Sequence, residues 1–145
     1  MNLTVVGTGY VGLVTGACFA EMGHRVTCVD IDADKVAKLK AGWIPIYEPG
    51  LKPIVLRGCE DGRLLFTTSL AEAMQDTEII FIAVGTPPAE DGSVDMSAVE
   101  AVAEEIAEHL TEYRIVVTKS TVPVGTHQSI SDLIRSRTDT PFDYV

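Results

Sequence analysis

Three glycines near the start of the chain have a spacing that could bind phosphate groups: Gly7, Gly9 and Gly12 form the pattern G-x-G-x-x-G. In this pattern the first glycine makes a tight turn, the second lets a pyrophosphate approach the backbone, and the third lets a helix pack closely on a strand. The free N–H groups and positive dipole end of that helix would then face the phosphates. Asp30 follows at the tip of the next apolar run, where a carboxylate can accept hydrogen bonds from a ribose diol. Because a carboxylate there would repel a 2′-phosphate, the pattern predicts that the chain binds NAD rather than NADP.

The segments around these residues supply the elements that such a site requires. The glycine pattern alone is weak evidence, since it also describes an ordinary glycine turn. Here a short apolar run, 3–6, precedes it, a run of small residues typical of a helix, 11–22, follows it, and a second apolar run, 26–29, ends at the acid. The order of strand, glycine turn, helix, strand and acid favours the dinucleotide site over the simple turn.

The rest of the chain alternates between strand-like and helix-like segments, which predicts a three-layer α/β/α fold with a Rossmann-type, doubly wound parallel sheet. We expect the strand order 3-2-1-4-5-6, with the sixth strand truncated at the end of the chain. The later strands are expected at 64–67, 78–84, 114–118 and 142–145, and the later helices at 32–41, 51–58, 69–74, 97–110 and 127–137. Ligands of such sheets bind at the carboxyl ends of the strands. The loops there hold Gly85 and Thr86 after the fourth strand and Thr121 after the fifth.

Polar residues mark the ends of several of these helices. Asp32 can cap the start of one helix, and Ser69 with Glu72 has the spacing of a capping box. Residues 60–63 are expected to form a polar turn before the third strand. Lys35, on the first turn of its helix and near Asp30, is either a solvated lysine or a contact to the adenosine end of the cofactor.

The composition argues against several classes of function. The chain has 145 residues, enough for one domain with its own core, and 21 acidic against 11 basic residues give a net charge of −10. Nucleic acid is not expected as a partner, because binding its phosphates over a surface needs a basic face. The first 20 residues carry no charge, but they lack a basic segment and contain four glycines. We therefore expect neither a membrane span nor a signal peptide there, and a cytoplasmic location. No metal is expected, since the three cysteines and three histidines lack metal-ligand spacing.

Four blocks of residues resemble the UDP-glucose 6-dehydrogenase family, in the same order and over the whole chain. They are the glycine block 7–13, the block 45–51 (Pro-Ile-Tyr-Glu-Pro-Gly-Leu), the block 81–87 (Phe-Ile-Ala-Val-Gly-Thr-Pro) and the block 119–126 (Lys-Ser-Thr-Val-Pro-Val-Gly-Thr). Dehydrogenases of GDP-mannose and of UDP-N-acetylmannosamine share much of this pattern, while the second and fourth blocks look closest to the UDP-glucose branch. The resemblance implies an NAD-dependent oxidoreductase that converts UDP-glucose to UDP-glucuronate, from alcohol through aldehyde to acid, with two NAD per turnover.

The resemblance also implies which residues hold the cofactor. The backbone around Tyr10 and Val11 would meet the pyrophosphate, and Asp30 and Lys35 would hold the adenosine ribose. The complete set of expected cofactor contacts is Gly7, Gly9, Tyr10, Val11, Gly12, Asp30, Lys35, Gly85, Thr86 and Thr121.

Thr121 is the one residue to which the resemblance gives a catalytic role. It would lie near the nicotinamide and help to position the water or sugar hydroxyl for proton transfer. From the residues alone, a loop hydroxyl that satisfies the local backbone is an equally good interpretation of Thr121.

Several parts of the family's machinery have no counterpart in residues 1–145. Its nucleophilic cysteine and the lysine, asparagine, aspartate and glutamate that act with it lie beyond Val145, and none of Cys18, Cys28 and Cys59 matches the cysteine's motif. The central helix and the UDP-binding domain are absent as well. We therefore expect an NAD-binding domain that is a fragment, inactive alone, of an enzyme that binds a UDP-sugar and forms a homodimer or larger assembly. Two alternatives stay open: another nucleotide-sugar dehydrogenase of the same superfamily, and a non-catalytic NAD-binding module.

Overall fold

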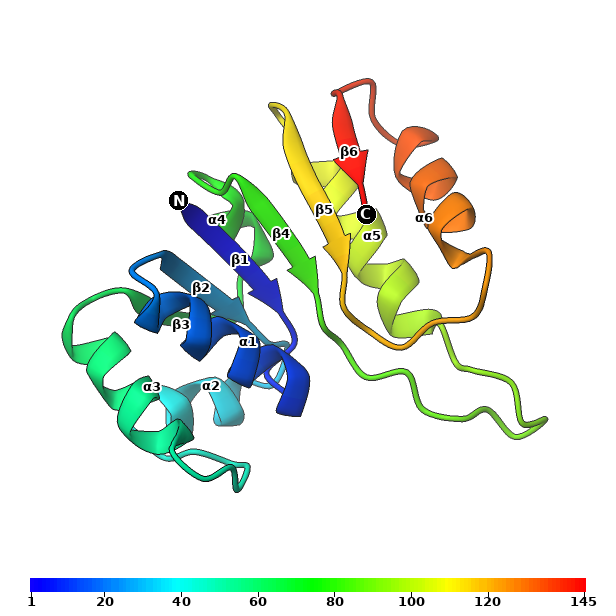
Figure 1. Cartoon of the computed structure of the whole chain (residues 1–145). Coiled ribbons are helices and arrows are strands. Elements are labelled where there is room, and N and C mark those ends of the chain that lie inside the picture. The colour runs from blue at the N-terminus through cyan, green and yellow to red at the C-terminus, as the bar shows by residue number, and fades with distance from the viewer.

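A single six-stranded parallel sheet forms the centre of the molecule (Figure 1). The computed structural model describes all residues from 1 to 145. The strands are β1 (Asn2–Val6), β2 (Arg25–Val29), β3 (Leu64–Thr67), β4 (Ile79–Ile82), β5 (Arg114–Thr118) and β6 (Phe142–Tyr144). Their order is β3-β2-β1-β4-β5-β6, and every neighbouring pair is parallel, which confirms the predicted topology.

Helices cover both faces of the sheet. They are α1 (Tyr10–Glu21), α2 (Ala33–Lys40), α3 (Leu51–Glu60), α4 (Leu70–Met74), α5 (Ser97–His109) and α6 (Thr126–Arg135). One hydrophobic core contains residues of α1, α2 and α3, and a separate core contains residues of α4, α5 and α6. The three predicted layers are therefore confirmed. None of these helices combines the length and apolar character that crossing a membrane requires.

Successive side chains along a strand point alternately into these two cores. In β4, Ile80 and Ile82 are fully buried in the core beneath α4–α6, while Ile79 and Phe81 pack against the opposite core and are only partly buried. Both faces of this strand are therefore covered, as the continuous apolar run predicts for a parallel sheet.

The registers bring four strands to an end at the same level. Val6 pairs with both Val29 and Ile82, and Ile82 pairs with Thr118. The residues that leave the sheet at this edge are Gly7, Asp30, Ala83 and Lys119. The sequence-distant loops that carry the candidate residues are thereby assembled along one rim.

Helix α3 is longer than predicted. It includes Glu60, which we expected in the turn that follows, and the turn begins only at Asp61. Gly62 ends the helix because its φ of +67° is the left-handed conformation that glycine adopts without a Cβ penalty. The N–H of Arg63 then donates to the carbonyl of Gly58 at 2.9 Å, a bond typical of this helix ending.

The predicted capping box at α4 is only half formed. The hydroxyl of Ser69 accepts from the N–H of Glu72 at 3.2 Å, as predicted. The carboxylate of Glu72, however, does not reach back to the N–H of Ser69. It accepts instead from the hydroxyl of Thr67 at 3.2 Å, and that hydroxyl accepts from the N–H of Ser69 at 3.1 Å. Thr67 at the end of β3 thus completes the cap.

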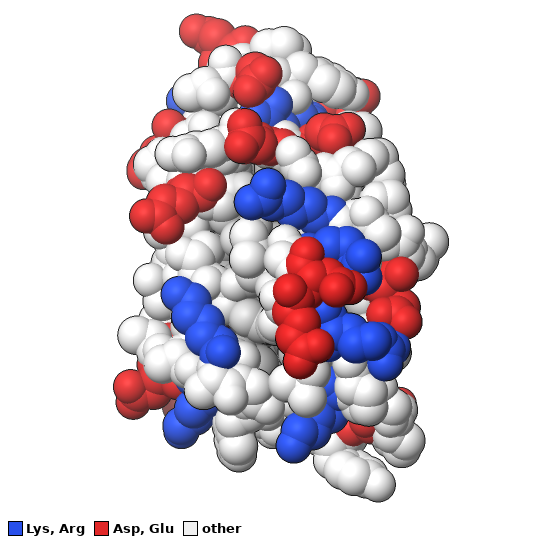
Figure 2. Space-filling view, turned by 90° about the vertical axis from the view of Figure 1, so that its left-hand side faces the viewer, with Lys and Arg blue, Asp and Glu red and all other residues white.

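Charges of both signs are mixed on the side of the molecule that carries α2, α3 and β3 (Figure 2). Two well-exposed ion pairs lie at α3 and the turn that follows it: Arg57 with Glu21 at 2.8 Å and Arg63 with Asp61 at 2.5 Å. Because all four side chains are well exposed, each pair stabilises the fold by at most about 1 kcal/mol. This face therefore resembles an ordinary solvated surface rather than a basic patch.

The caps lead to a prediction about stability. We expect Ser69→Ala to lower the free energy of unfolding by about 1 kcal/mol, because the N–H of Glu72 loses its partner. Ser97→Ala is the matched control, since Ser97 is an exposed residue in the first turn of α5 and no side chain caps that helix, whose N-cap is Met96. Urea unfolding of both variants tests this, and equal losses of stability would contradict it.

Candidate cofactor-binding site

A groove of about 370 Å³ lies at the carboxyl ends of β1, β2 and β4. One wall is the glycine turn, and another is formed by Asp30 and Lys35. The opposite wall comes from the loop after β4 and from one face of α5, and includes Gly85, Ala98, Ala101, Val102 and Glu105. The groove therefore lies where the sheet's connections diverge on either side of β1, as predicted for a doubly wound sheet.

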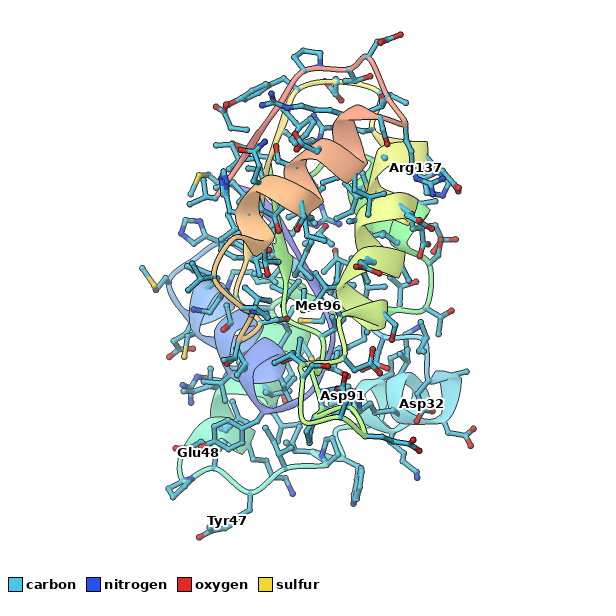
Figure 3. The ribbon with its side chains drawn as sticks, turned by 90° about the vertical axis from the view of Figure 1, so that its right-hand side faces the viewer. Asp32, Tyr47, Glu48, Asp91, Met96 and Arg137 are labelled. Carbon is cyan, nitrogen blue, oxygen red and sulfur yellow. The ribbon has the colours of Figure 1, made fainter.

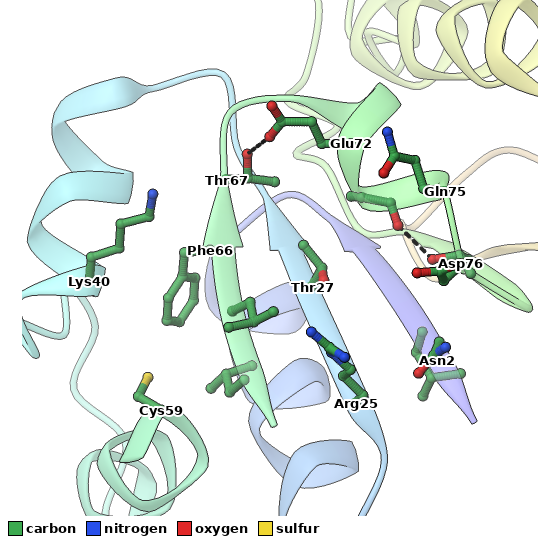
Figure 4. Close-up of a pocket in the computed structure, with 15 residues that line it drawn as sticks. Asn2, Arg25, Thr27, Lys40, Cys59, Phe66, Thr67, Glu72, Gln75 and Asp76 are labelled. Atoms are coloured by element: carbon green, nitrogen blue, oxygen red, sulfur yellow. Dashed lines mark hydrogen bonds between the residues drawn. The ribbon is translucent and has the colours of Figure 1, made fainter. Parts of the chain in front are cut away.

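A wider hollow of about 610 Å³ lies elsewhere, along the edge strand β3 and the start of β1 and β2 (Figure 4). Arg25, Thr27, Thr67 and Gln75 are among the residues that line it, and none of its lining residues is a glycine. It therefore lacks the glycine turn that lets a pyrophosphate approach the first turn of a helix. The smaller groove is for this reason the better candidate for a dinucleotide.

Glycine occupies the three positions of the turn for different structural reasons. Gly7 has a φ of +100°, and a Cβ there would lie 2.6 Å from the carbonyl oxygen of Ala83. A Cβ on Gly12 would lie 1.8 Å from the carbonyl oxygen of Gly7. A Cβ on Gly9 would meet nothing within 4 Å and would point into open space. The first and third glycines are therefore required for packing, while the second leaves the backbone accessible from outside.

The N-terminus of α1 presents free donors beside this turn. Gly9 is the N-cap, its conformation is extended, and no side chain caps the helix. The carbonyl of Gly9 accepts from the N–H of Leu13 at 2.9 Å, which leaves the N–H groups of Tyr10, Val11 and Gly12 without an intrahelical partner. No acidic residue occupies the first turn. These N–H groups and the positive end of the helix dipole suit an anion.

Four hydrogen bonds hold the carboxylate of Asp30. Oδ2 accepts from the N–H of Thr8 at 3.0 Å, from the hydroxyl of Thr8 at 2.6 Å and from Nζ of Lys35 at 2.8 Å. Oδ1 accepts from the N–H of Asp32 at 3.1 Å. Burial by itself would raise the pKa of Asp30, but these donors outweigh it and lower the pKa to about 2. Asp30 is therefore a carboxylate at neutral pH, and Lys35 is its ion-pair partner rather than a freely solvated lysine.

The loops after β4 and β5 are joined to each other. The hydroxyl of Thr86 donates to the carbonyl of Thr121 at 2.8 Å, and the hydroxyl of Ser120 donates to the carbonyl of Val84 at 2.7 Å. The hydroxyl of Thr121 itself is exposed and makes no hydrogen bond within the chain. The structure therefore contains no hydrogen bond that would support the interpretation of Thr121 as a hydroxyl that satisfies the local backbone. Thr86 and Thr121 lie side by side but are not part of the groove walls.

Two of the three cysteines, Cys28 and Cys59, do not have the environment of a nucleophile. Burial raises the pKa of Cys28 to about 12, with a smaller contribution from Cys59. Burial also raises the pKa of Cys59, followed by the negative charge of Glu60. Reactive cysteines require a lowered pKa, so these two thiols are neutral packing groups.

The block 45–51 lies on a loop at the same end of the molecule as the glycine turn. Tyr47 is 90% exposed. Figure 3 shows Tyr47 and Glu48 at the end where Asp32 and Asp91 also lie, with Arg137 toward the opposite end. Tyr47 and Glu48 are accordingly surface residues, while Leu51 at the end of the block is buried in the core beneath α1–α3 and Ile46 packs against that core.

Sequence reasoning missed two residues that organise the site, Thr8 and Ser120. Thr8 stands at a variable position of the glycine pattern, so the pattern assigns it no role. The only available signal is a hydroxyl beside Gly7 at the tip of one strand and an acid at the tip of the strand next to it. For Ser120 the signal is the density of hydroxyls after the fifth strand, which indicates the loop but not the individual residue.

Comparison with known proteins identifies a family. The family model described as "UDP-glucose/GDP-mannose dehydrogenase family, NAD binding domain" matches residues 1–144. UDP-glucose 6-dehydrogenase of Pseudomonas aeruginosa is 56% identical over 93% of the chain, and UDP-glucose 6-dehydrogenase YwqF of Bacillus subtilis is 51% identical over 92%. The chain spans only 30% of the length of each of these relatives.

Solved structures show the same fold. A UDP-glucose dehydrogenase from Pyrobaculum islandicum superimposes with a TM-score of 0.93 and 41% identity, and covers 98% of this chain. A GDP-mannose dehydrogenase from Pseudomonas aeruginosa, solved as a ternary complex, has a TM-score of 0.95 and 34% identity over 99%. The chain corresponds to 34% and 35% of these two chains.

The different roles of two glycines can be separated by experiment. We expect Gly12→Ala to lower the free energy of unfolding by roughly 3 kcal/mol or more, because its Cβ overlaps a backbone oxygen. Gly9→Ala should change stability by less than about 1 kcal/mol, since its φ of −70° suits alanine. It should nevertheless weaken NAD binding by roughly tenfold or more, because the methyl group enters the space left for the pyrophosphate. Denaturant unfolding and calorimetric NAD titration distinguish the two effects, and an unchanged NAD affinity in Gly9→Ala would contradict the assigned role.

Proposed function

The chain belongs to the UDP-glucose/GDP-mannose dehydrogenase family and is an NAD-binding domain of that family, and from this we propose that it serves a UDP-glucose 6-dehydrogenase. The observation that carries the proposal is the 56% identity to a relative with that name. The GDP-mannose dehydrogenase of known structure is 34% identical. The amino-acid sequences of the blocks 45–51 and 119–126 also support the UDP-glucose branch.

We propose that the pyrophosphate of NAD lies against the N–H groups of Tyr10 and Val11 and beside Gly7, Gly9 and Gly12. The free N–H groups of the α1 N-terminus support this placement. Asp30 and Lys35 would hold the adenosine ribose, and Gly85 and Thr86 would contact the cofactor from the loop after β4. NAD, when bound, supplies the hydride acceptor. The carboxylate of Asp30, which is ionised at neutral pH, favours NAD because it accepts from a diol and repels a 2′-phosphate.

We propose that Thr121 positions a water molecule or the sugar hydroxyl for proton transfer. Its unpartnered hydroxyl is free to bind either one, and the bond from Thr86 to its carbonyl holds the loop that carries it. A hydroxyl that orients the proton of a reacting alcohol is useful in a step that removes a hydride from the same carbon. Thr121 would in this way also approach the nicotinamide.

Oxidation of the sugar alcohol through the aldehyde to the acid removes two electrons twice, so two NAD are consumed for each UDP-glucuronate formed. The neutral thiols of Cys28 and Cys59 are not suited to attack the aldehyde. We therefore propose that residues 1–145 act as one domain of a larger enzyme and have no turnover alone. The chain's coverage of 30% of its relatives supports this. A cytoplasmic location and a dimeric or larger assembly stay predictions.

A substrate panel on the intact enzyme tests the function. We expect UDP-glucose to be oxidised with two NADH formed per sugar, and kcat/KM for GDP-mannose and UDP-N-acetylmannosamine to be lower by roughly tenfold or more. A preference for one of those two sugars would favour the other branch of the family. NAD binding without oxidation of any of the three would favour the non-catalytic module.

The role of Thr121 has its own test. We expect Thr121→Ala to lower kcat by roughly tenfold to a hundredfold, with a smaller effect on NAD affinity, because the positioning hydroxyl is lost. Val124→Ala on the same loop is the control, since Val124 is fully exposed and offers no hydroxyl. Steady-state kinetics at saturating NAD measure the difference, and wild-type kcat in Thr121→Ala would refute the role.

A further inference from the structure

The two oxygens of the Asp30 carboxylate are not equally occupied. Oδ2 accepts three hydrogen bonds, two from Thr8 and one from Lys35, while Oδ1 accepts only the N–H of Asp32. A carboxylate oxygen offers about two lone-pair directions. Oδ2 is therefore saturated, while Oδ1 keeps one free acceptor direction, and Asp30 is one of the residues that line the groove.

We propose that Thr8 is a positioning residue that sets cofactor specificity: it fixes Oδ2 of Asp30 so that Oδ1 is the oxygen that receives the ribose diol of NAD. This rests on the NAD-binding part of the proposed function and not on the sugar assignment. Thr8 acts through Asp30, because its own hydroxyl is already committed to Oδ2.

The position of Thr8 suits this task. Its side chain is fully buried, so the hydroxyl has a fixed place. Its N–H and its hydroxyl converge on the same oxygen at 3.0 Å and 2.6 Å, so a single residue holds that oxygen from two directions. The pairing of Val6 with Val29 at the ends of β1 and β2 brings Thr8 opposite Asp30.

The ion pair with Lys35 makes this orientation matter for specificity. The ammonium group lies 2.8 Å from Oδ2 and offsets the negative charge of the carboxylate. Repulsion of a 2′-phosphate by charge alone is therefore weakened at this site. Discrimination then depends on Oδ1 being presented as an acceptor, because a ribose hydroxyl can donate to it and an ionised phosphate cannot.

The test compares the dissociation constants of NAD and NADP in the intact enzyme without any sugar substrate. We expect Thr8→Val to weaken NAD binding by roughly fivefold to twentyfold and NADP binding by less. The preference for NAD over NADP would thereby become smaller. Thr8→Ser, which keeps the hydroxyl, should restore the preference. Thr8→Ala should reduce the preference for NAD over NADP in the same way, and it is the variant to measure if Thr8→Val does not fold.

Thr4→Val is a matched control for a general effect of losing a buried hydroxyl. Thr4 is as buried as Thr8, and its hydroxyl bonds the carbonyl of Ala73 at 2.9 Å, away from the groove. Thr4→Val should lower the denaturant concentration at the unfolding midpoint and leave both dissociation constants unchanged.

A pH profile and a double-mutant cycle distinguish an effect of Thr8 on the Asp30 carboxylate from a general loss of structure. Without the hydroxyl the pKa of Asp30 rises from about 2, so on acidification NAD binding should begin to weaken at a higher pH in Thr8→Val than in wild type. In an Asp30→Asn background, Thr8→Val should have no further effect on NAD affinity.

An unchanged NAD-to-NADP preference in Thr8→Val, or an equal loss of NAD affinity in the Asp30→Asn background, would overturn the proposal. A sugar preference other than UDP-glucose would contradict the proposed function but would leave these binding results intact.

Discussion

The close packing of backbone at the glycine turn is the constraint on which the cofactor groove depends. A side chain on Gly12 would strike the carbonyl of Gly7, and a side chain on Gly7 would strike that of Ala83. Without these side chains, the end of β1, the start of α1 and the end of β4 can meet at backbone distance. The same packing sets the direction in which the free N–H groups of α1 point. Since β1 pairs with β2 on its other side, the acid at the tip of β2 is held in register with this turn.

Local donors explain how a strongly acidic chain can bind an anionic cofactor. The net charge of −10 disfavours anions at long range, but screening limits that effect to about a Debye length. Within the groove the partners are the N–H groups of α1 and the ammonium group of Lys35. Two carboxylates line the groove: Asp30, whose charge is offset by Lys35 and by hydrogen bonds, and Glu105 of α5 on the opposite wall. The local donors must therefore favour an anion in spite of one acidic side chain that α5 contributes.

The parts of the fold that follow from periodicity and turn chemistry could be predicted, and the parts that depend on tertiary contact could not. Apolar runs indicated all six strands, and their alternation with helices was sufficient for the topology. The end of α3 was misplaced because Glu60 suits a helix and a turn equally well. The cap of α4 was only half right because Thr67, from the preceding strand, replaced a bond that the local pattern assigns to Glu72.

The candidate site shows the same division. Gly7, Gly12 and Asp30 were recognisable because their types are forced by backbone space and by charge. The bonds from Thr8 to Asp30 and from Thr86 to Thr121 join residues that are distant in the chain, and no pattern in the sequence relates them. The pKa of Asp30 depends in part on the same distant contact, because Thr8 adds its donors to those of Asp32 and Lys35, which are close to Asp30 in the chain.

The contact between Gly7 and Ala83 also has a consequence for the order in which the molecule can assemble. The glycine turn is made first during synthesis, yet the backbone that closes over it arrives only after more than half of the chain. The loop that must close between them contains three strands and four helices, and its closure entropy has to be offset before the turn is held in place. A peptide of residues 1–30 would therefore contain the whole phosphate-binding pattern without the wall that shapes it. The cofactor turn is short in sequence, but its conformation belongs to the assembled sheet.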